Sequence, residues 1–309
     1  MMTTVQSASP ETRTTAAFHG SSRPRRWAWL TAVLAGGLLL FAAYERQAWT
    51  SGVNSDGASN ALQAWDMLHG NLLLHGWTLT DVSFYTIELP QLAVAERIFG
   101  LSPLVLHLTA ALDYTLVVLL AALAAKGRAT GLEGVVRSLL AAGIMLAPPL
   151  GATTTVLMHD PDHTATQIVL LLVWLVLDRC RPGWPTVAVV AVLLTWGQLS
   201  DPMTLYEGAL PLAIVCAIRI CRSRGRRTRF ELSLIGAALA SIAAAAAAGW
   251  LLRQAGGYLV LAPDTAFAPI RSMVQNIPLT AHDVLVLFGA DFSGVHSWPQ
   301  AIIPLVHLA

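Results

Sequence analysis

Residues 103–125 read PLVLHLTAALDYTLVVLLAALAA, and this stretch decides the fold class. Its only charged side chain is Asp113, and as a helix it is long enough to cross the hydrocarbon core of a bilayer, which is about 30 Å thick. Comparable runs that are almost free of charge lie on both sides of it along the chain. We therefore expect an all-α fold, a polytopic bundle of transmembrane helices.

The composition of the whole chain agrees with this expectation. Hydrophobic residues make up 55% and charged residues only 12% of the sequence, whereas a soluble domain carries about 25% charged residues. No basic patch is interleaved with aromatic residues, which argues against a nucleic-acid partner and for membrane lipids. About eight spans are predicted, namely residues 27–44, 103–125, 138–158, 164–178, 185–200, 203–220, 231–252 and a last one from about residue 298.

The basic residues are sorted by side of the membrane. Basic residues precede the first predicted span at residues 23–26, follow the second at residues 126–128, and gather again at residues 219–229. Cytoplasmic segments attract such residues, so the N-terminus is expected in the cytoplasm of a multi-pass plasma-membrane protein. The acidic residues gather on the opposite side, which makes the non-cytoplasmic face the expected active face.

Two domain segments follow from these spans. Residues 1–22 are rich in Ser, Thr and Ala without periodicity, which predicts a disordered cytoplasmic tail. Residues 23–309 form a single transmembrane domain, with residues 45–102 as a long first outer loop. The last apolar run stops at Ala309, too early to cross, so either the domain is truncated at its C-terminus or the chain ends there naturally.

The long outer loop has helical periodicity of its own. Apolar residues recur at helical spacing from Ala58 to Leu72 and again over residues 89–100, with polar residues on the other face. Both stretches are therefore expected to be amphipathic helices in the outer membrane interface.

Acidic residues and a histidine flank the first of these helices. Asp56 stands just after the first span, where a carboxylate can act as a general base or a metal ligand, or can simply stabilise a helix N-terminus. Asp66 and His69 lie near the other end and are candidate auxiliary residues, with a solvated polar face as the simpler interpretation.

The turn between the third and fourth predicted spans carries the densest set of potential ligands. His159, Asp160, Asp162 and His163 occupy four of five consecutive positions. Carboxylates favour Mg²⁺ or Mn²⁺, and imidazoles shift the preference toward Zn²⁺, which we expect less. Helix capping explains part of this pattern, with Asp160 as the N-cap of the fourth predicted span and Pro161 as its first helical residue.

The outer end of the sixth predicted span carries two further candidate residues. The same capping device recurs at Asp201 and Pro202, where the span opens. Asp201, and Glu207 six residues further on, are additional candidate substrate-binding or auxiliary residues.

Asp56 after the first span and Asp160-Pro161-Asp162 between the third and fourth give the chain a layout that resembles the GT-C superfamily of membrane glycosyltransferases. Members of that superfamily use polyprenyl-phosphate-linked sugars. The resemblance covers about residues 25–300 and is mostly architectural. The chain departs from the family where Asp56-Gly57 replaces the adjacent Asp-Glu pair of protein mannosyltransferases, and it lacks the large outer domain of oligosaccharyltransferases.

The resemblance implies transfer of a sugar from a lipid phosphate at the non-cytoplasmic face. Asp56 would be the catalytic base, and Asp160, Asp162 and His163, together with Asp56, would hold a divalent cation against the donor phosphate. Two alternatives remain open: a transporter or lipid-carrier flippase, which Asp113 favours, and an inactive scaffold subunit of a cell-envelope assembly.

Overall fold

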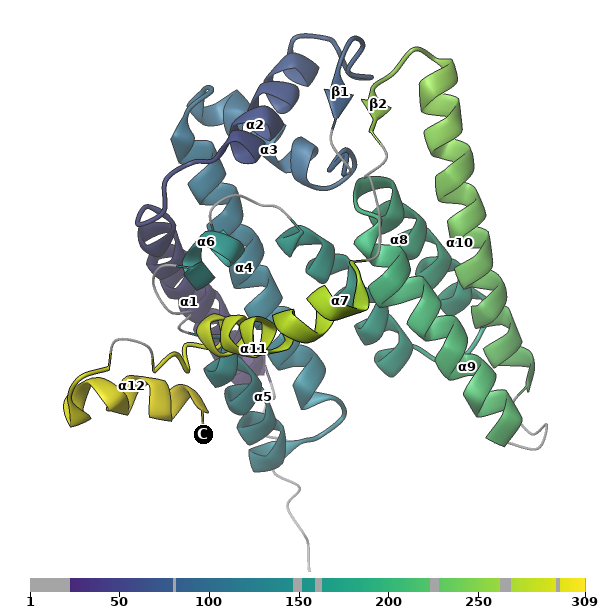
Figure 1. Cartoon of the computed structure of the whole chain (residues 1–309). Coiled ribbons are helices and arrows are strands. Elements are labelled where there is room, and N and C mark those ends of the chain that lie inside the picture. The colour runs from purple at the N-terminus through teal and green to yellow at the C-terminus, as the bar shows by residue number, and fades with distance from the viewer. Residues whose placement is uncertain are drawn as a thin grey trace, which may run out of the picture. The chain divides into compact units, whose positions relative to one another are not determined.

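The computed structural model describes residues 23–79, 82–146, 152–158, 163–222, 228–261, 268–292 and 295–308. The chain divides into two compact units, Met1–Leu38 and Leu39–Ala309, and the elements discussed below belong to the second, apart from the first part of α1. The described chain is mostly helical (Figure 1), and one short strand pair departs from the expected all-α fold.

The elements follow one another along the chain in this order: α1 (Arg23–Ala48), α2 (Ser55–Leu68), β1 (Thr78–Leu79), α3 (Glu88–Phe99), α4 (Pro103–Lys126), α5 (Gly131–Met145), α6 (Ala152–Met158), α7 (Thr164–Arg179), α8 (Trp184–Ser200), the π-helix η1 (Leu205–Ala209), α9 (Leu210–Arg222), α10 (Thr228–Gln254), β2 (Leu259–Val260), α11 (Ile270–Leu287) and α12 (Trp298–Leu308).

The predicted bundle of eight spans is wrong. Of the helices in the described ranges, only α4 and α10 are long and apolar enough to cross a membrane. They coincide with the predicted spans 103–125 and 231–252. Two such helices are a weaker indication of membrane association than the eight that were expected.

Breaks in the helices, and short helices, explain part of the difference. The predicted span 138–158 is divided between α5 and α6, and α6 has only 7 residues. The predicted span 203–220 is divided between η1 and α9, which has 13 residues. With 16 and 17 residues, α7 and α8 reach about 24–26 Å at a rise of 1.5 Å per residue, short of the hydrocarbon thickness of about 30 Å.

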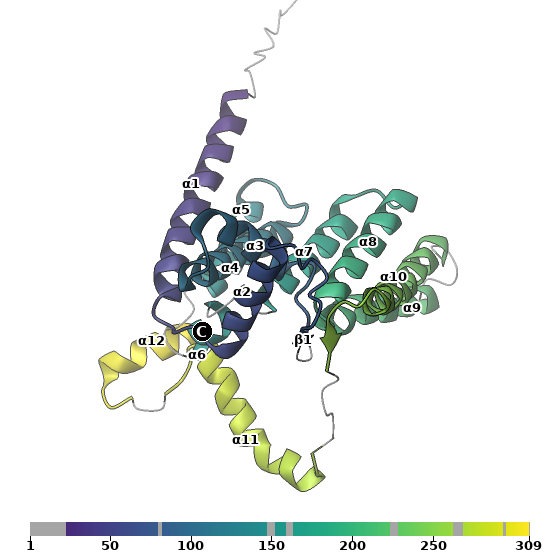
Figure 2. The same ribbon diagram turned by 90° about the horizontal axis from the view of Figure 1, so that it is seen from above.

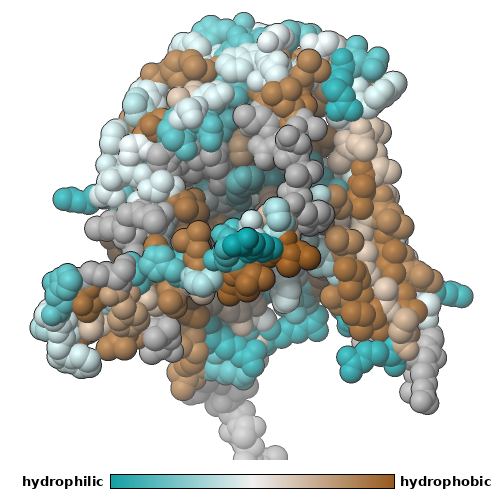
Figure 3. Space-filling model, viewed as in Figure 1, coloured by the Kyte–Doolittle hydropathy of each residue, from teal (hydrophilic) through white to brown (hydrophobic). Residues whose placement is uncertain are grey.

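The outer surface of α9 and α10 is apolar. Leu210, Ile214 and Ile218 are exposed on α9, and Leu239 and Trp250 are exposed on α10. The space-filling view shows these two helices as a largely hydrophobic flank (Figure 3). Exposed apolar surface of this extent is typical of a face that contacts lipid or protein.

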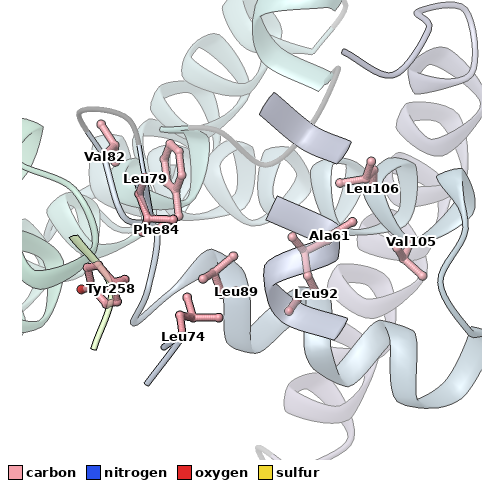
Figure 4. Close-up of a cluster of buried hydrophobic side chains, with 11 residues drawn as sticks. Ala61, Leu74, Leu79, Val82, Phe84, Leu89, Leu92, Val105, Leu106 and Tyr258 are labelled. Carbon is pink, nitrogen blue, oxygen red and sulfur yellow. The ribbon is translucent and has the colours of Figure 1, made fainter. Parts of the chain in front are cut away.

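The two helices predicted in the long loop are present as α2 and α3. Asn54 caps α2 by accepting a hydrogen bond from Gly57 N at 2.7 Å, so the helix begins at Ser55 rather than Ala58. The apolar faces of α2 and α3 pack on each other and on the start of α4 around Ala61, Leu92 and Val105 (Figure 4). This cluster stabilises the loop as a folded cap.

The short strands tie the long loop to the end of α10. β1 pairs in parallel with β2, with Thr78 opposite Leu259. The ring Nδ1 of His75 lies 2.6 Å from the carbonyl oxygen of Gly256, beside the strand pair. Residues almost 200 positions apart therefore meet at one end of the unit.

Helices α4, α7, α8 and α10 stand in a row, and each packs on the next (Figure 2). Glycine allows the closest approach within this row. A Cβ atom at Gly197 of α8 would lie 2.7 Å from the side chain of the wholly buried Thr204 and 3.2 Å from Val169 of α7. The turn after α8 can therefore pack back against α8, and α7 can approach α8 this closely, only because position 197 has no side chain.

We predict that Gly197→Ala lowers the free energy of unfolding by about 1–3 kcal/mol, because the overpacking outweighs a helix-propensity gain of up to about 1 kcal/mol. The matched control is Gly236→Ala in α10, where a Cβ atom would meet nothing within 4 Å. The control should be neutral or stabilising by up to about 1 kcal/mol. Thermal unfolding in detergent measures both, and equal effects of the two substitutions would contradict the packing role of Gly197.

Candidate functional site

The end of α8 carries the best-connected carboxylate among the described residues. Asp201 is wholly buried. Its Oδ2 accepts hydrogen bonds from Thr166 Oγ1 at 2.6 Å and His163 Nδ1 at 2.8 Å, and its Oδ1 accepts one from Met203 N at 2.9 Å. The last bond is the cap predicted for the Asp201-Pro202 pair. The first two bonds attach the turn after α8 to the N-terminus of α7.

These bonds decide the charge of Asp201. Burial alone would raise its pKa, but the hydrogen bonds from His163, Thr166 and Met203 N outweigh burial and hold the pKa below its usual value. Asp201 is therefore ionised at neutral pH. An ionised carboxylate that accepts a hydrogen bond from Nδ1 fixes the orientation of the His163 ring.

His163 connects this buried carboxylate to the exterior. It precedes α7 in a left-handed backbone conformation, with φ 50°, and about half of its side chain is exposed. Its ring meets the edge of Phe84 with the centroids 5.4 Å apart. A half-exposed imidazole held by a buried carboxylate is an arrangement used in proton transfer, in binding of phosphate and in metal ligation.

Glu88, the first residue of α3, lies against the same turn. It is wholly buried, and its Oε2 accepts a hydrogen bond from Ser200 Oγ at 2.7 Å. Burial raises the pKa of Glu88 to about 8, with a smaller upward contribution from the nearby Asp201 carboxylate and partial opposition from the Ser200 hydroxyl. Glu88 therefore carries a proton at neutral pH. We call Glu88, His163, Thr166, Ser200 and Asp201 the Asp201 cluster.

Hydrogen bonds between residues 83–86 and the last turn of α8 fix the position of the Asp201 cluster. Ser83 Oγ donates to Leu199 O at 2.9 Å, and Phe84 N donates to Ser200 O at 2.9 Å. Thr86 and Trp196 exchange two bonds of 2.8 Å, from Thr86 Oγ1 to Trp196 O and from Trp196 Nε1 to Thr86 O. These four hydrogen bonds attach the segment before α3 to the last turn of α8.

Two of the predicted metal ligands, Asp160 and Asp162, lie outside the described residues. The residues on either side of them are described. Met158 ends α6, and His163 belongs to the Asp201 cluster. α7 begins at Thr164 with His163 as its N-cap, so Asp160 is not the cap that the sequence suggested.

The chain that leaves α1 lies against α6. Gln47 Nε2 donates to Thr154 Oγ1 at 2.9 Å, and the hydroxyl groups of Ser51 and Thr155 are 3.2 Å apart. Trp49 stacks on His107 of α4, with the ring centroids 4.3 Å apart. The segment before Asp56 therefore contacts the helix that leads into the acidic turn.

Asp56 itself is exposed in the first turn of α2. Its one described side-chain contact is with Ser55 Oγ, which lies 3.4 Å from Oδ1. The structure thus gives Asp56 the position expected of a helix N-terminal carboxylate and leaves it accessible to solvent.

Asp66 and His69 shape the other end of α2. Asp66 Oδ2 accepts hydrogen bonds from Asn71 Nδ2 at 2.6 Å and from Trp77 Nε1 at 2.8 Å, and these bonds lower the pKa of Asp66. His69 is the C-cap of α2, and its Nδ1 lies 2.7 Å from Trp65 O. Both side chains organise the turn that follows α2, away from the contacts of the Asp201 cluster.

Glu207 lies in the π-helix η1, on the exposed rim next to the Asp201 cluster. Gln167 Nε2, one residue beyond Thr166 on α7, donates to Glu207 Oε2 at 2.7 Å. Asp201 and Glu207, both predicted as auxiliary residues, therefore contact the same turn of α7. π-Helical turns occur often at functional sites.

A complete metal centre is not present among the described residues, where no group of three or more His, Cys, Asp or Glu side chains is placed to hold a metal ion. His163 is the one predicted cation ligand that is both described and part of the Asp201 cluster. Its bond to Asp201 is the kind of second contact that orients a metal-ligating imidazole. A complete cation site would therefore need Asp160 and Asp162 in addition to His163.

Sequence reasoning missed Glu88, Thr166 and Ser200. Glu88 stands beside Leu89 at the start of α3, and both side chains are buried. That position, on the buried side of an amphipathic helix, was the available signal. Thr166 and Ser200 carried no signal, because isolated hydroxyl groups are common in helices.

We predict that Asp201→Asn lowers the free energy of unfolding by about 1–3 kcal/mol near neutral pH, because charge-assisted hydrogen bonds to buried donors are lost. The folded-state pKa of Asp201 is lowered, so its contribution is present above the unfolded pKa and disappears as pH falls through the folded value. Denaturant unfolding at several pH values measures this difference.

The matched control is Glu207→Gln, whose exposed bond to Gln167 should change stability by no more than about 0.5 kcal/mol. If Asp201→Asn lowered the free energy of unfolding by no more than this control, the Asp201 carboxylate would not be the group that holds the turn after α8 to the N-terminus of α7.

Comparison with protein-family models, with curated proteins and with solved structures finds no match. The comparisons therefore assign no family to the chain. Its function is inferred below from the chemistry of the Asp201 cluster and of the residues next to it in the sequence.

Proposed function

We propose that the chain is a membrane glycosyltransferase that transfers a sugar from a polyprenyl-phosphate donor at the non-cytoplasmic face of the plasma membrane. One observation carries the proposal. The half-exposed His163, which directly follows the Asp160-Pro161-Asp162 turn, is bonded at 2.8 Å to the wholly buried Asp201. A helix that can span a membrane, α4, packs on α7, which His163 caps.

The chemistry of sugar transfer suits this arrangement. The bond between the anomeric carbon and the phosphate oxygen breaks, the phosphate leaves as an anion, and the acceptor oxygen bonds to the same carbon while losing its proton. A positive charge near the leaving phosphate lowers the barrier. The His163 ring, oriented through Nδ1 by Asp201 at 2.8 Å, is proposed to help hold such a positive charge, a divalent cation, at the exposed edge of the Asp201 cluster.

The remaining roles follow from position. Asp56, exposed at the start of α2, is proposed as the base that accepts the acceptor proton. Asp160 and Asp162, with His163 and Asp56, are proposed to hold a divalent cation, Mg²⁺ or Mn²⁺, which when bound would neutralise phosphate charge. Asp201 is proposed to position His163.

The orientation in the membrane is part of the same proposal. The end of α4 and the start of α10 are flanked by basic residues, among them Lys126, Arg128, Arg222 and Arg229. The opposite ends of these helices lead to α3 and to β2, whose partner strand belongs to the long loop. The positive-inside rule therefore favours a cytoplasmic location for the basic ends and a non-cytoplasmic location for the long loop.

A transfer assay tests the function. With the purified protein in lipid and a radiolabelled polyprenyl-phosphate sugar, Asp56→Asn and Asp160→Asn should each lower the rate by at least about 100-fold, as expected for loss of general base catalysis or of a metal ligand. Asp283→Asn on the exposed face of α11 is the matched control and should retain the full rate. Full transfer by Asp56→Asn would refute the assigned base.

Native cysteines test the orientation. Cys180 and Cys221 are exposed near the basic ends of α7 and α9, whereas Cys216 is buried. A membrane-impermeant maleimide should label the protein only after the cells are permeabilised. The Ser55→Cys variant, with its new thiol on the exposed start of α2, should be labelled in intact cells. Labelling of the wild-type protein in intact cells would reverse the proposed orientation.

Transport across the membrane is the second candidate function, because Asp113 is wholly buried near the middle of α4. Ionisable residues in spanning helices often mark ion or substrate paths. Proteoliposomes that move a polyprenyl-phosphate lipid between leaflets, and that lose this activity in Asp113→Asn but not in Asp56→Asn, would favour a flippase. Absence of both transfer and transport would favour an inactive scaffold subunit.

A further inference from the structure

The C-terminal ends of α4 and α7 hold each other through two arginines. Arg179, at the end of α7, donates from Nη2 to Leu123 O at 2.7 Å and to Gly127 O at 3.2 Å, both at the end of α4. Arg128, just after α4, donates from Nε to Asp178 O at 3.1 Å in the last turn of α7. Each helix end is thus capped by an arginine from the other, which fixes the two following turns side by side.

These turns carry an excess of positive charge. We call residues 126–130 and 178–183 the paired turns. Glu133, the next acidic residue along the chain, is already paired with Arg137 at 2.5 Å. Four positive residues therefore stand against one negative residue, a net charge of +3, and the five are Lys126, Arg128, Asp178, Arg179 and Arg181.

Most of this charge is on the surface. The one carboxylate, Asp178, lies 3.9 Å from Arg128 Nε and 3.8 Å from Arg179 Nε. Lys126 and Arg181 are exposed, and neither forms an ion pair with any residue that the structure describes. The side chain of Arg128 is also 76% exposed. The paired turns therefore present cationic groups to an anion from outside the chain.

The location of the paired turns indicates which anion. α4 has 24 residues, is long and apolar enough to cross a bilayer, and ends at Lys126, so the turns lie at headgroup depth when α4 spans. Trp184, at the start of α8, is 81% exposed, and Thr186 Oγ1 holds this start to the turn by donating to Arg181 O at 2.7 Å. Tryptophan is enriched at this depth because its indole is apolar with one polar N–H.

We propose that the paired turns bind the anionic headgroup of a phospholipid in the leaflet at the basic end of α4. Lys126 and Arg181 contact the lipid phosphate, and Arg128 and Arg179 keep the two turns together while adding to the positive field. Trp184 lies against the glycerol region of the same lipid. Binding requires that α4 lie in a bilayer, as proposed above, but does not require sugar transfer.

Native mass spectrometry of the purified full-length protein in detergent, titrated with phosphatidylglycerol or phosphatidylcholine, tests the site. The wild-type protein should bind the anionic lipid more tightly. Lys126→Gln combined with Arg181→Gln should weaken that binding about 25-fold, about fivefold for each basic residue removed, and leave phosphatidylcholine binding unchanged. Neither side chain has an ion pair to lose within the described residues, so the variant should fold.

The matched control combines Arg97→Gln with Arg271→Gln, which removes two exposed charges elsewhere in the chain and should keep the wild-type affinities. Equal affinity of the wild-type protein for the two lipids, or equal losses in the two double variants, would overturn the site. Inorganic phosphate at the concentration of the lipid should not displace phosphatidylglycerol, and displacement would show a site for free phosphate instead.

A measurement on the wild-type protein keeps the proposal falsifiable if a variant does not fold. The thermal unfolding midpoint should be higher in phosphatidylglycerol nanodiscs than in phosphatidylcholine nanodiscs. This difference should shrink as NaCl rises from about 0.05 M to about 0.5 M, because salt screens exposed charges. A difference that is absent or independent of salt would overturn the site alone, whereas failure to bind either lipid would also contradict the membrane insertion of α4.

Discussion

The hydrogen bonds that end helix α8 are the constraint on which the rest of the structure depends. A helix that stops inside an apolar bundle leaves carbonyl and carboxyl oxygens that must find donors. Ser200 O receives Phe84 N, and the Asp201 carboxylate receives His163, Thr166 and Met203 N. These bonds come from the long loop, from α7 and from the turn into η1, so one helix end joins two segments that are remote in sequence to the turn that follows it.

Local features of the fold were predictable from sequence, and the number of spans was not. Helical spacing of apolar residues predicts α2 and α3, and long apolar runs predict α4 and α10, because each of these signals lies within one segment. Apolar content alone cannot show where a run is interrupted. The division of residues 138–158 between α5 and α6, and the π-helical turn before α9, depend on tertiary contacts, which is why eight spans were expected where two helices qualify.

The candidate site was predictable residue by residue but not as a set. Asp201, His163 and Glu207 were recognised as ionisable groups in an apolar chain, yet nothing in the sequence pairs His163 with Asp201 across 38 positions. Glu88 was overlooked because a glutamate in a polar loop is ordinarily solvated, and only the packing of α3 shows that this one is buried. Three-dimensional proximity is the information that periodicity and composition lack.

The backbone of His163 limits what can replace this residue. Its φ of 50° lies in the left-handed region, which disfavours most side chains by about 1–2 kcal/mol. The bond to the buried carboxylate offsets that strain, so ring and backbone geometry are maintained together. Lysine or arginine could donate to the Asp201 carboxylate but would retain the strain, whereas glycine would relax the backbone and remove the donor. Histidine thus combines tolerance of this conformation with a ring nitrogen that can donate to Asp201.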